Sequence, residues 1–335
     1  MVYFGRHPRI TQPRKIRPLS QTVTSCPRCQ RRTPAGRGKC IYCGESLPLT
    51  SIESAPPQRN IDTADLAFNA ILQPGTSVAS DNVVQSVAFA LHLELAEAQA
   101  LIATPKPIPI ARCQTLEEAE MICALVRSCG LKAAVVADEE MQLATELLRA
   151  RRIDLGDNEI QLTHSSGTLV LSNSDVRLLV LGELSNRRVD YIESLRGRRS
   201  GSAGVLDSSE YRAEETVLDV YSDCLNRSFR IKSDSFDYSG LVSPLSFRSD
   251  LNFKAALTTL REGLPRAVFY EDFTSLGGLL GRAWPERTRN ETRGFKRPGL
   301  SFRSVAQASA VSDNRDQFER YSRLMFLQFE SLHKD

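Results

Sequence analysis

The sequence predicts a multidomain α+β protein, and three observations support this class. The chain has 335 residues, which is more than one domain usually holds, so two or three domains are expected. Two CxxC motifs near the N-terminus predict a small metal-binding module. Helical periodicity dominates residues 62–140, whereas the apolar runs and alternations typical of strands dominate residues 145–270.

The composition is that of an ordinary soluble globular protein, with 41% hydrophobic and 25% charged residues. A formal net charge of +3 is too small to indicate nucleic-acid binding by the whole molecule. The first thirty residues contain no apolar run of the signal-peptide kind. No stretch approaches the roughly 20 apolar residues of a membrane span. We therefore expect a cytoplasmic protein that does not associate with membranes.

Residues 1–25 are basic and interrupted by prolines, and they show no hydrophobic period. We expect them to form a flexible arm, here called the basic arm. Such an arm could contact RNA phosphates, or it could be a solvated tail.

The strongest chemical signal is the pair Cys26-Pro-Arg-Cys29 and Cys40-Ile-Tyr-Cys43, separated by ten residues. Each CxxC turn can place two sulfurs on one side of an ion. Four thiolates complete the tetrahedral shell of a structural zinc, whereas a catalytic zinc keeps an open position. We expect one structural zinc ion bound by Cys26, Cys29, Cys40 and Cys43. A redox pair or disulfides are the alternative.

The region 26–45 is too small to bury much apolar surface, so a bound metal would supply its folding energy. Pro34-Ala-Gly36 and Gly38 predict a hairpin turn between the pairs, and Gly44 suits a positive φ. The CPxC, ten-residue, CxYCG pattern of residues 26–44 resembles the short zinc-ribbon modules at the N-termini of many bacterial proteins. Such ribbons occur in proteins with very different functions.

The predicted ribbon carries its own cations, and residues 46–61 after it have the composition of a linker. Together with the basic arm, these cations make the most basic region of the chain. The side chains that could contact nucleic acid are Arg28, Arg31, Arg32, Arg37 and Lys39.

Residues 62–140 predict one compact α/β domain. Thr115-Leu-Glu-Glu118 is a capping box that opens a helix, and Gly130 stands where a glycine commonly ends one. The expected order is a strand (66–72), a helix after Ser80, a second helix (94–103), a break at PKPIPI (105–110), a third helix from Thr115 and a closing strand (131–137).

The run NVVQSVAFALHLELAEAQALIATPKPIPI, followed by TLEEAEMICALVRSCGLKAAVV, resembles the C-terminal domain of the bacterial ribosomal stalk protein. HLELAEAQ (92–99) takes the place of the family's GLGLKEAK, and TLEEAE (115–120) that of its SKEEAE. The resemblance covers about 75 residues and implies the fold of that domain.

The family's factor-binding role is not implied, because its basic face is absent. The stalk proteins bind translation factors through lysines and arginines on the first two helices and through a glycine turn. The matching positions here hold Gln85, Ala88, His92, Glu94, Ala96 and Gln99.

Residues 145–270 predict a β-rich domain closed by a helix that Asp250 caps and Gly263 ends. A short connecting helix is expected at 141–150, and residues 196–204 read as a flexible basic loop. Several strands followed by one helix suggest that this domain folds as a pleckstrin-homology-like barrel. A helix-backed α+β sheet is the alternative fold. Strands are expected at 159–164, 168–172, 176–184, 188–193, 217–221, 229–232 and 236–238.

Residues 271–310 predict an irregular basic linker. Leu276-Gly-Gly-Leu-Leu-Gly281 lacks the lysine of a phosphate-binding loop, so a turn is expected there. Phe295 and Phe302 lie among cations and could stack on bases, although a disordered linker has the same composition.

Residues 311–335 predict a C-terminal amphipathic helix. Phe318, Tyr321, Met325, Phe329 and Leu332 share one face. So apolar a face must be buried, either on the rest of the chain or against a partner.

No catalytic motif is visible in the sequence. The four histidines lie outside any pattern with a nucleophile, and the remaining cysteines (Cys113, Cys123, Cys129 and Cys224) show no disulfide spacing, which suits a reducing compartment. We expect a non-enzymatic zinc-binding adaptor or regulatory protein with a protein partner. The alternative is an RNA- or ribosome-binding protein that uses the basic arm and ribbon, and a third possibility is an unrecognised hydrolase.

Overall fold

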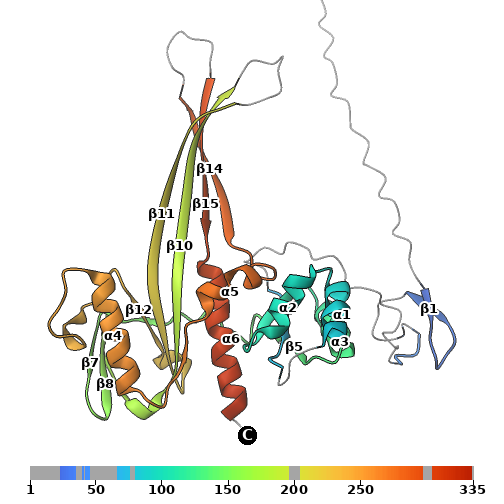
Figure 1. Ribbon diagram of the computed structural model, residues 1–335, viewed down its shortest axis with the longest axis horizontal. Helices are drawn as coiled ribbons and strands as arrows, with labels where there is room; N and C mark the ends of the chain where they lie inside the picture. The colour runs from blue at the N-terminus through green and yellow to red at the C-terminus, as the bar shows by residue number, and fades with distance from the viewer. Residues whose placement is uncertain are drawn as a thin grey trace, which may run out of the picture. The chain divides into compact units, whose positions relative to one another are not determined.

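The computed structural model describes residues 23–34, 40, 42–45, 66–75, 80–195, 204–296 and 304–333 (Figure 1). The chain divides into two compact units, residues 1–53 and 54–335. The described residues of the first unit (23–34, 40 and 42–45) are called the ribbon below, and the second unit is called the body. Residues 1–22 of the basic arm and the predicted linker at 46–61 lie outside the described residues.

The ribbon contains two short antiparallel strands, β1 (Val23–Ser25) and β2 (Arg32–Pro34). Its buried cluster consists of Cys26 and Cys40, with Cys29 and Cys43 against them. The described ribbon therefore has no apolar core apart from the cysteines themselves.

The first part of the body contains the elements expected for residues 62–140, in the expected order, and one further strand. Thr115 accepts a hydrogen bond from the backbone N–H of Glu118 at 3.2 Å, and Gly130 has a φ of 86°. The predicted N-cap at Thr115 and the helix end at Gly130 are thus both present. The elements are β3 (Phe68–Leu72), α1 (Asp81–Leu91), α2 (Leu95–Ala103), β4 (Ile108–Cys113), α3 (Leu116–Ser128) and β5 (Ala133–Ala137).

The strand β4 is an addition to the predicted elements. The sequence indicated only that the prolines of PKPIPI end a helix. In the structure the three-stranded sheet has the order β4-β3-β5, so β4 is an edge strand. Pro109 lies opposite Ile71, beside a shift in the register of β3 and β4. An edge strand with an irregular register tolerates the missing N–H of proline.

The β-rich part of the body is built on a seven-stranded sheet. Its order is β14-β15-β10-β11-β12-β6, and β13 pairs with β10. The pairs β10–β13 and β12–β6 are parallel and the others antiparallel. The strands are β6 (Leu148–Arg149), β10 (Val176–Leu195), β11 (Gly204–Ser222), β12 (Phe229–Lys232), β13 (Val268–Tyr270), β14 (Arg287–Lys296) and β15 (Ser304–Asp313).

Four of these strands continue as a section that we call the β-blade, residues 186–195, 204–213, 287–296 and 304–313. Figure 1 shows β14, β15, β10 and β11 running side by side along this section. None of the blade's described side chains belongs to either hydrophobic core of the body. Backbone pairing, rather than apolar burial, therefore defines the described blade.

The prediction of an irregular linker at 271–310 was wrong. This region contains α5 (Phe273–Leu280), β14 and β15. Residues 287–293 (RTRNETR) carry polar side chains at every position, so no apolar alternation marks a strand. The sequence LGGLLG is not a turn, because α5 includes most of it and buries Phe273, Leu276 and Leu280.

Three smaller expectations were also corrected. Residues 141–150 form turns followed by β6, not a helix. The predicted strand at 188–193 is the continuation of β10, and the one at 236–238 is reduced to a single bridge between Arg152 and Asp237. Residues 196–203 lie outside the described part of the chain.

A second, three-stranded sheet consists of β7 (Arg152–Leu155), β8 (Glu159–His164) and β9 (Gly167–Ser172). Its apolar side chains share a core with β11, β12 and α4 (Ser249–Gly263). Most of the expected strands are present, which confirms a mixed α+β architecture. The closing helix is also present, but its N-cap is Arg248, and Asp250, which was expected to cap it, lies in its first turn. The comparison with a pleckstrin-homology-like barrel stays a prediction.

The C-terminal helix α6 (Arg315–His333) docks on the chain's own body. Phe318, Tyr321, Leu324 and Met325 are fully buried in the core that includes β3, β4 and α3. The polar side of the helix is buried as well, at Gln317, Arg320, Ser322 and Arg323.

A buried polar network joins α6 to the first part of the body. Asp138, 4% exposed, accepts a hydrogen bond from Arg112 at 2.6 Å and from Asn69 at 2.8 Å, and it lies 3.6 Å from Arg320. The indole N–H of Trp284 donates to Asn69 at 2.8 Å. The buried Asp138 carboxylate thereby links side chains of β3, β4 and α6, which are distant from one another in the sequence.

No single helix of the described residues is long and apolar enough to cross a membrane; only α1 and α2 taken together, bent by 112°, have that length and composition.

Candidate metal centre

The first cysteine pair lies in the turn that joins β1 to β2. The backbone N–H of Gln30 donates to the Cys26 carbonyl at 2.8 Å, and the Cys26 N–H donates to the Arg31 carbonyl at 3.1 Å. Gln30 closes this loop with a φ of 58°. The hairpin therefore surrounds the first CxxC pair, whereas the turn expected between the pairs falls largely on residues 35–39, outside the described residues.

The second pair repeats this arrangement. The N–H of Gly44 donates to the Cys40 carbonyl at 2.9 Å, and the Cys40 N–H donates to the Glu45 carbonyl at 2.8 Å. The φ of Gly44 is 70°, which confirms the expectation for this glycine. Two loops with the same hydrogen-bond spacing therefore each present two sulfurs.

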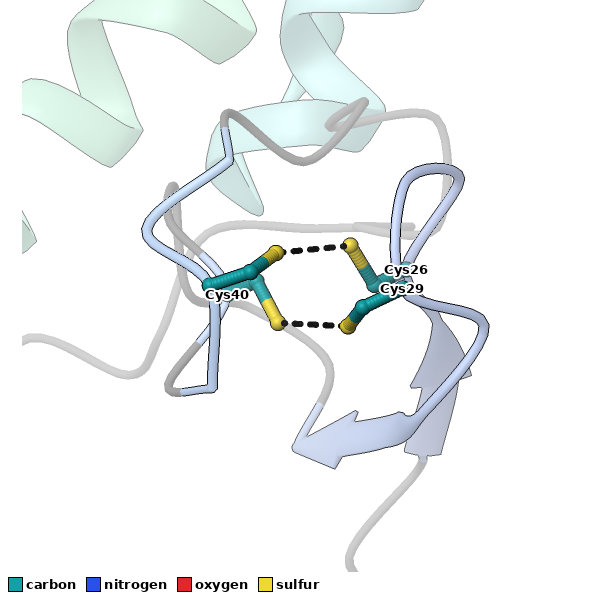
Figure 2. Close-up of side chains that lie close together, drawn as sticks. Cys26, Cys29 and Cys40 are labelled. Atoms are coloured by element: carbon teal, nitrogen blue, oxygen red, sulfur yellow. Dashed lines mark hydrogen bonds between the residues drawn. The ribbon is translucent and has the colours of Figure 1, made fainter.

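The four sulfur atoms converge (Figure 2). Sγ of Cys26 lies 3.6 Å from Sγ of Cys43, and Sγ of Cys29 lies 3.6 Å from Sγ of Cys40. All four lie within 4.8 Å of one another. Tetrahedral coordination at a Zn–S distance of about 2.3 Å requires sulfurs about 3.8 Å apart. Cys26, Cys29, Cys40 and Cys43 are thus close enough to hold one metal ion.

The local electrostatics differ between the two sulfurs of the second cysteine pair. The Tyr42 backbone N–H points to the Cys40 sulfur at 3.4 Å and lowers the pKa of this thiol to about 6. The Glu45 backbone N–H also lowers the pKa of Cys43, but burial and the three neighbouring sulfurs outweigh it and raise that pKa to about 12. A bound metal ion would supply the positive charge that allows the four sulfurs to be present together as thiolates.

The chemistry of this donor set is limited. Soft thiolates in a tetrahedron suit zinc or iron–sulfur chemistry rather than calcium or magnesium. If all four sulfurs bind one ion, no coordination position remains for water or substrate. The arrangement can stabilise the ribbon, but it offers no place for hydrolytic chemistry.

The structure describes two of the five side chains proposed to contact nucleic acid. Arg28 lies 3.2 Å from the Glu45 carboxylate, and the Arg31 guanidinium lies 5.2 Å from the centre of the Tyr42 ring. The side chain of Arg32, and Arg37 and Lys39 as a whole, lie outside the described part. The only sequence signal for the contact residues Tyr42 and Glu45 is their position next to the second cysteine pair.

The other cysteines and histidines lie apart from this centre. Burial raises the pKa of Cys113 to about 12 and that of Cys123 to about 11, Cys129 is half-buried and Cys224 is exposed. His92 is exposed at the end of α1, and Nδ1 of His164 accepts from the Ser166 N–H at 3.4 Å. Within the described residues, the four ribbon cysteines are the one group of acidic, histidine or cysteine side chains placed to hold a metal.

None of the protein families, curated proteins or solved structures with which the chain was compared matches it.

Proposed function

We propose that this protein is a non-enzymatic, zinc-stabilised adaptor or regulatory protein. The observation that carries the proposal is the convergence of four cysteine sulfurs from two equivalent loops. A closed four-thiolate shell gives an ion a structural role. Since the described ribbon has no other core, the ion fixes the shape of a small surface, which suits recognition of a partner.

Exposed side chains on the ribbon and the blade support a protein partner. Tyr42 on the ribbon is 53% exposed and Tyr211 on the β-blade is 60% exposed. Tyrosine and arginine are enriched in protein–protein interfaces. Free thiols beside a thiolate centre also favour a reducing compartment such as the cytoplasm.

The order of elements from β3 to β5 supports kinship between residues 66–137 and the C-terminal domain of the ribosomal stalk protein. We carry over only the fold. The positions that match the family's basic factor-binding face hold no lysine or arginine in this chain.

The second candidate function is RNA or ribosome binding by the ribbon and the basic arm. The specific observation that favours it is the Arg31 guanidinium beside the exposed Tyr42 ring. An aromatic ring with a neighbouring cation can stack on a base. The pairing of Arg28 with Glu45 reduces the charge available for phosphates.

One experiment separates the two functions. The immobilised full-length protein is exposed to cell extract with and without nuclease, beside a Cys40→Ser/Cys43→Ser variant and a Cys224→Ser control. An adaptor retains a defined set of proteins after nuclease treatment, and it loses that set only in the double variant. Retention that nuclease abolishes and that falls steeply with salt assigns the RNA function instead. Retention of the same proteins by the double variant contradicts any role for the ribbon.

A further inference from the structure

A cavity of about 400 Å³ lies between residues 143–149, β12 and one face of α6. Its volume is within the range of small-molecule pockets, about 300–1,000 Å³. Five cations from these three elements line it, together with the carboxylates of two glutamates. The cations are Arg149, Arg230, Lys232, Arg315 and Arg323.

Arg230 is held in one orientation by buried partners. Its Nε and Nη2 donate to the two carboxylate oxygens of Asp219 at 2.6 and 2.9 Å, and its Nη1 donates to Glu319 at 3.2 Å. Asp219 is fully buried and also accepts from the Ser322 hydroxyl at 2.6 Å. Burial opposes the charge of Arg230, but the Asp219 carboxylate more than offsets it and raises the pKa of the guanidinium. This cation is therefore rigid and already neutralised.

The cations at the start of α6 and the end of β12 share one carboxylate as their ion-pair partner. Glu215 lies 3.4 Å from Lys232 and 3.6 Å from Arg315. These pairs leave Arg149 and Arg323 as the lining cations that make no ion pair with a carboxylate of the described residues.

Arg323 is the more unusual of the two, because it is only 6% exposed. Its Nη2 donates to the carbonyl of Thr145, and its Nη1 is buried with no hydrogen-bond partner among the described residues. A buried guanidinium without a counter-charge is costly unless an anion joins it. Arg149, which is exposed, donates to the Ser235 hydroxyl at 2.5 Å and carries the second uncompensated charge.

We propose that this pocket binds the phosphate group of a small molecule, with Arg149 and Arg323 as its charge partners. A guanidinium presents paired N–H donors that match the oxygens of phosphate. Arg149 and Arg323 are two cations without an ion-pair partner among the described residues, opposed only by the Glu146 carboxylate in the same lining, and they suit a phosphate monoester, whose charge at neutral pH is about −1.5 to −2. Asp219 and Glu215 hold the other cations in place, so the pocket is ordered before the ligand enters. The site is in the body and is independent of the metal centre.

The test measures binding to the full-length protein by calorimetry and the shift in its unfolding midpoint by Trp284 fluorescence. The probes are inorganic phosphate, glycerol 3-phosphate as an organic monoester, succinate, and sodium chloride at equal ionic strength. A ligand that binds only the folded state raises the midpoint as its concentration passes its Kd. We expect a saturable rise with a phosphate and none with chloride. Tighter binding of glycerol 3-phosphate than of inorganic phosphate would assign an organic ligand, and the reverse order free phosphate.

Variants locate the site. Arg149→Gln removes an exposed side chain with a single hydrogen bond, so it should fold normally and bind phosphate at least tenfold more weakly. Arg323→Gln should abolish binding. Arg151→Gln is the matched control, because Arg151 is also exposed but does not line the pocket. The proposal is overturned if phosphate and chloride act alike, if succinate alone binds, or if Arg149→Gln binds phosphate as well as Arg151→Gln does.

Discussion

The ribbon and the body bury their interiors by different means. In the described ribbon, four cysteines make up the buried cluster and each strand has three residues. In the body, two apolar cores are filled by side chains such as Phe229, Phe273 and Tyr321. Apolar burial of this kind contributes roughly 25 cal/mol per Å², a contribution that the ribbon almost entirely lacks.

This difference predicts that the two units depend on different interactions for folding, metal binding in the ribbon and apolar packing in the body. We propose that the ribbon folds around an ion, because four thiolates would repel one another and the described ribbon residues supply no apolar core besides the cysteines. The body needs complementary packing around α6. A change in one unit should therefore leave the other intact, and each prediction below tests that separation.

The largest effect is expected from Cys40→Ser combined with Cys43→Ser. The double substitution removes half of the sulfur ligands, and with them most of a zinc-binding free energy of about 10–16 kcal/mol. Elemental analysis should show one zinc per chain in the wild type and none in the variant. Cys224→Ser, which removes an exposed thiol outside the ribbon, should keep its zinc. A double variant that retains stoichiometric zinc would place the metal elsewhere.

In the body, Asp138→Ala should be strongly destabilising, by about 3–5 kcal/mol, because it leaves buried charges uncompensated. Arg112 and Arg320 both lie within ion-pair distance of this carboxylate. Burial, together with the repulsion from Arg112, already lowers the pKa of Arg320. Denaturant unfolding followed by Trp284 fluorescence measures the loss. Glu139→Ala, at an exposed neighbour, is the control, and equal stability of the two variants would show that the network contributes little.

Phe318→Ala should cost the body about 3–5 kcal/mol through loss of apolar contact and a residual cavity. The Phe318 ring is fully buried and meets Phe273 edge-on, with ring centres 5.0 Å apart. Phe247→Ala removes a ring that is fully exposed, so its unfolding midpoint should not change. The zinc content should be the same in both variants. Loss of zinc from Phe318→Ala would show that the two units are coupled.

Gly182→Ala should destabilise the body by about 1–3 kcal/mol, because an added methyl group overpacks the core. The new Cβ would collide with the Phe318 ring. Gly278→Ala makes the same chemical change inside α5, where there is open space, and should raise stability by about 0.5–1 kcal/mol. We therefore predict that the denaturation midpoint falls in Gly182→Ala and rises in Gly278→Ala. Two changes of the same sign would contradict it.

Thr115→Ala should have the smallest effect, about 1 kcal/mol, through loss of the cap on α3. Circular dichroism melting of the full-length protein would detect it. Thr115→Ser keeps a hydroxyl at the cap and should restore most of the stability. If the serine and alanine variants have the same melting temperature, the hydrogen bond between residue 115 and Glu118 does not stabilise the protein.

Local signals in the sequence predicted much of this fold. The spacing of the cysteines predicted that four sulfurs converge, and Thr115 and Gly130 predicted the two ends of α3. The apolar runs located β8 and β12. Each of these features is encoded within a few adjacent residues, so it can be read without knowledge of the tertiary structure.

The features that the sequence did not predict depend on distant partners. Residues 287–293 have no apolar alternation, and they form β14 because β15 pairs with them. Arg323 is a charged residue on an amphipathic helix, yet it is buried and donates to the carbonyl of Thr145, in a segment distant in the sequence. Long-range pairing and burial of this kind leave no periodic pattern in the chain.

The most direct test of the central claim is amide hydrogen exchange on the full-length protein, with and without a zinc chelator under reducing conditions. The reporters are the amides of Gln30 and Gly44, which bond to Cys26 and Cys40, and the segment around the buried Trp284. We predict that chelation removes protection from the two ribbon amides and leaves the Trp284 segment unchanged. Ribbon amides that stay protected without metal, or a Trp284 segment that loses protection at the same time, would contradict the account.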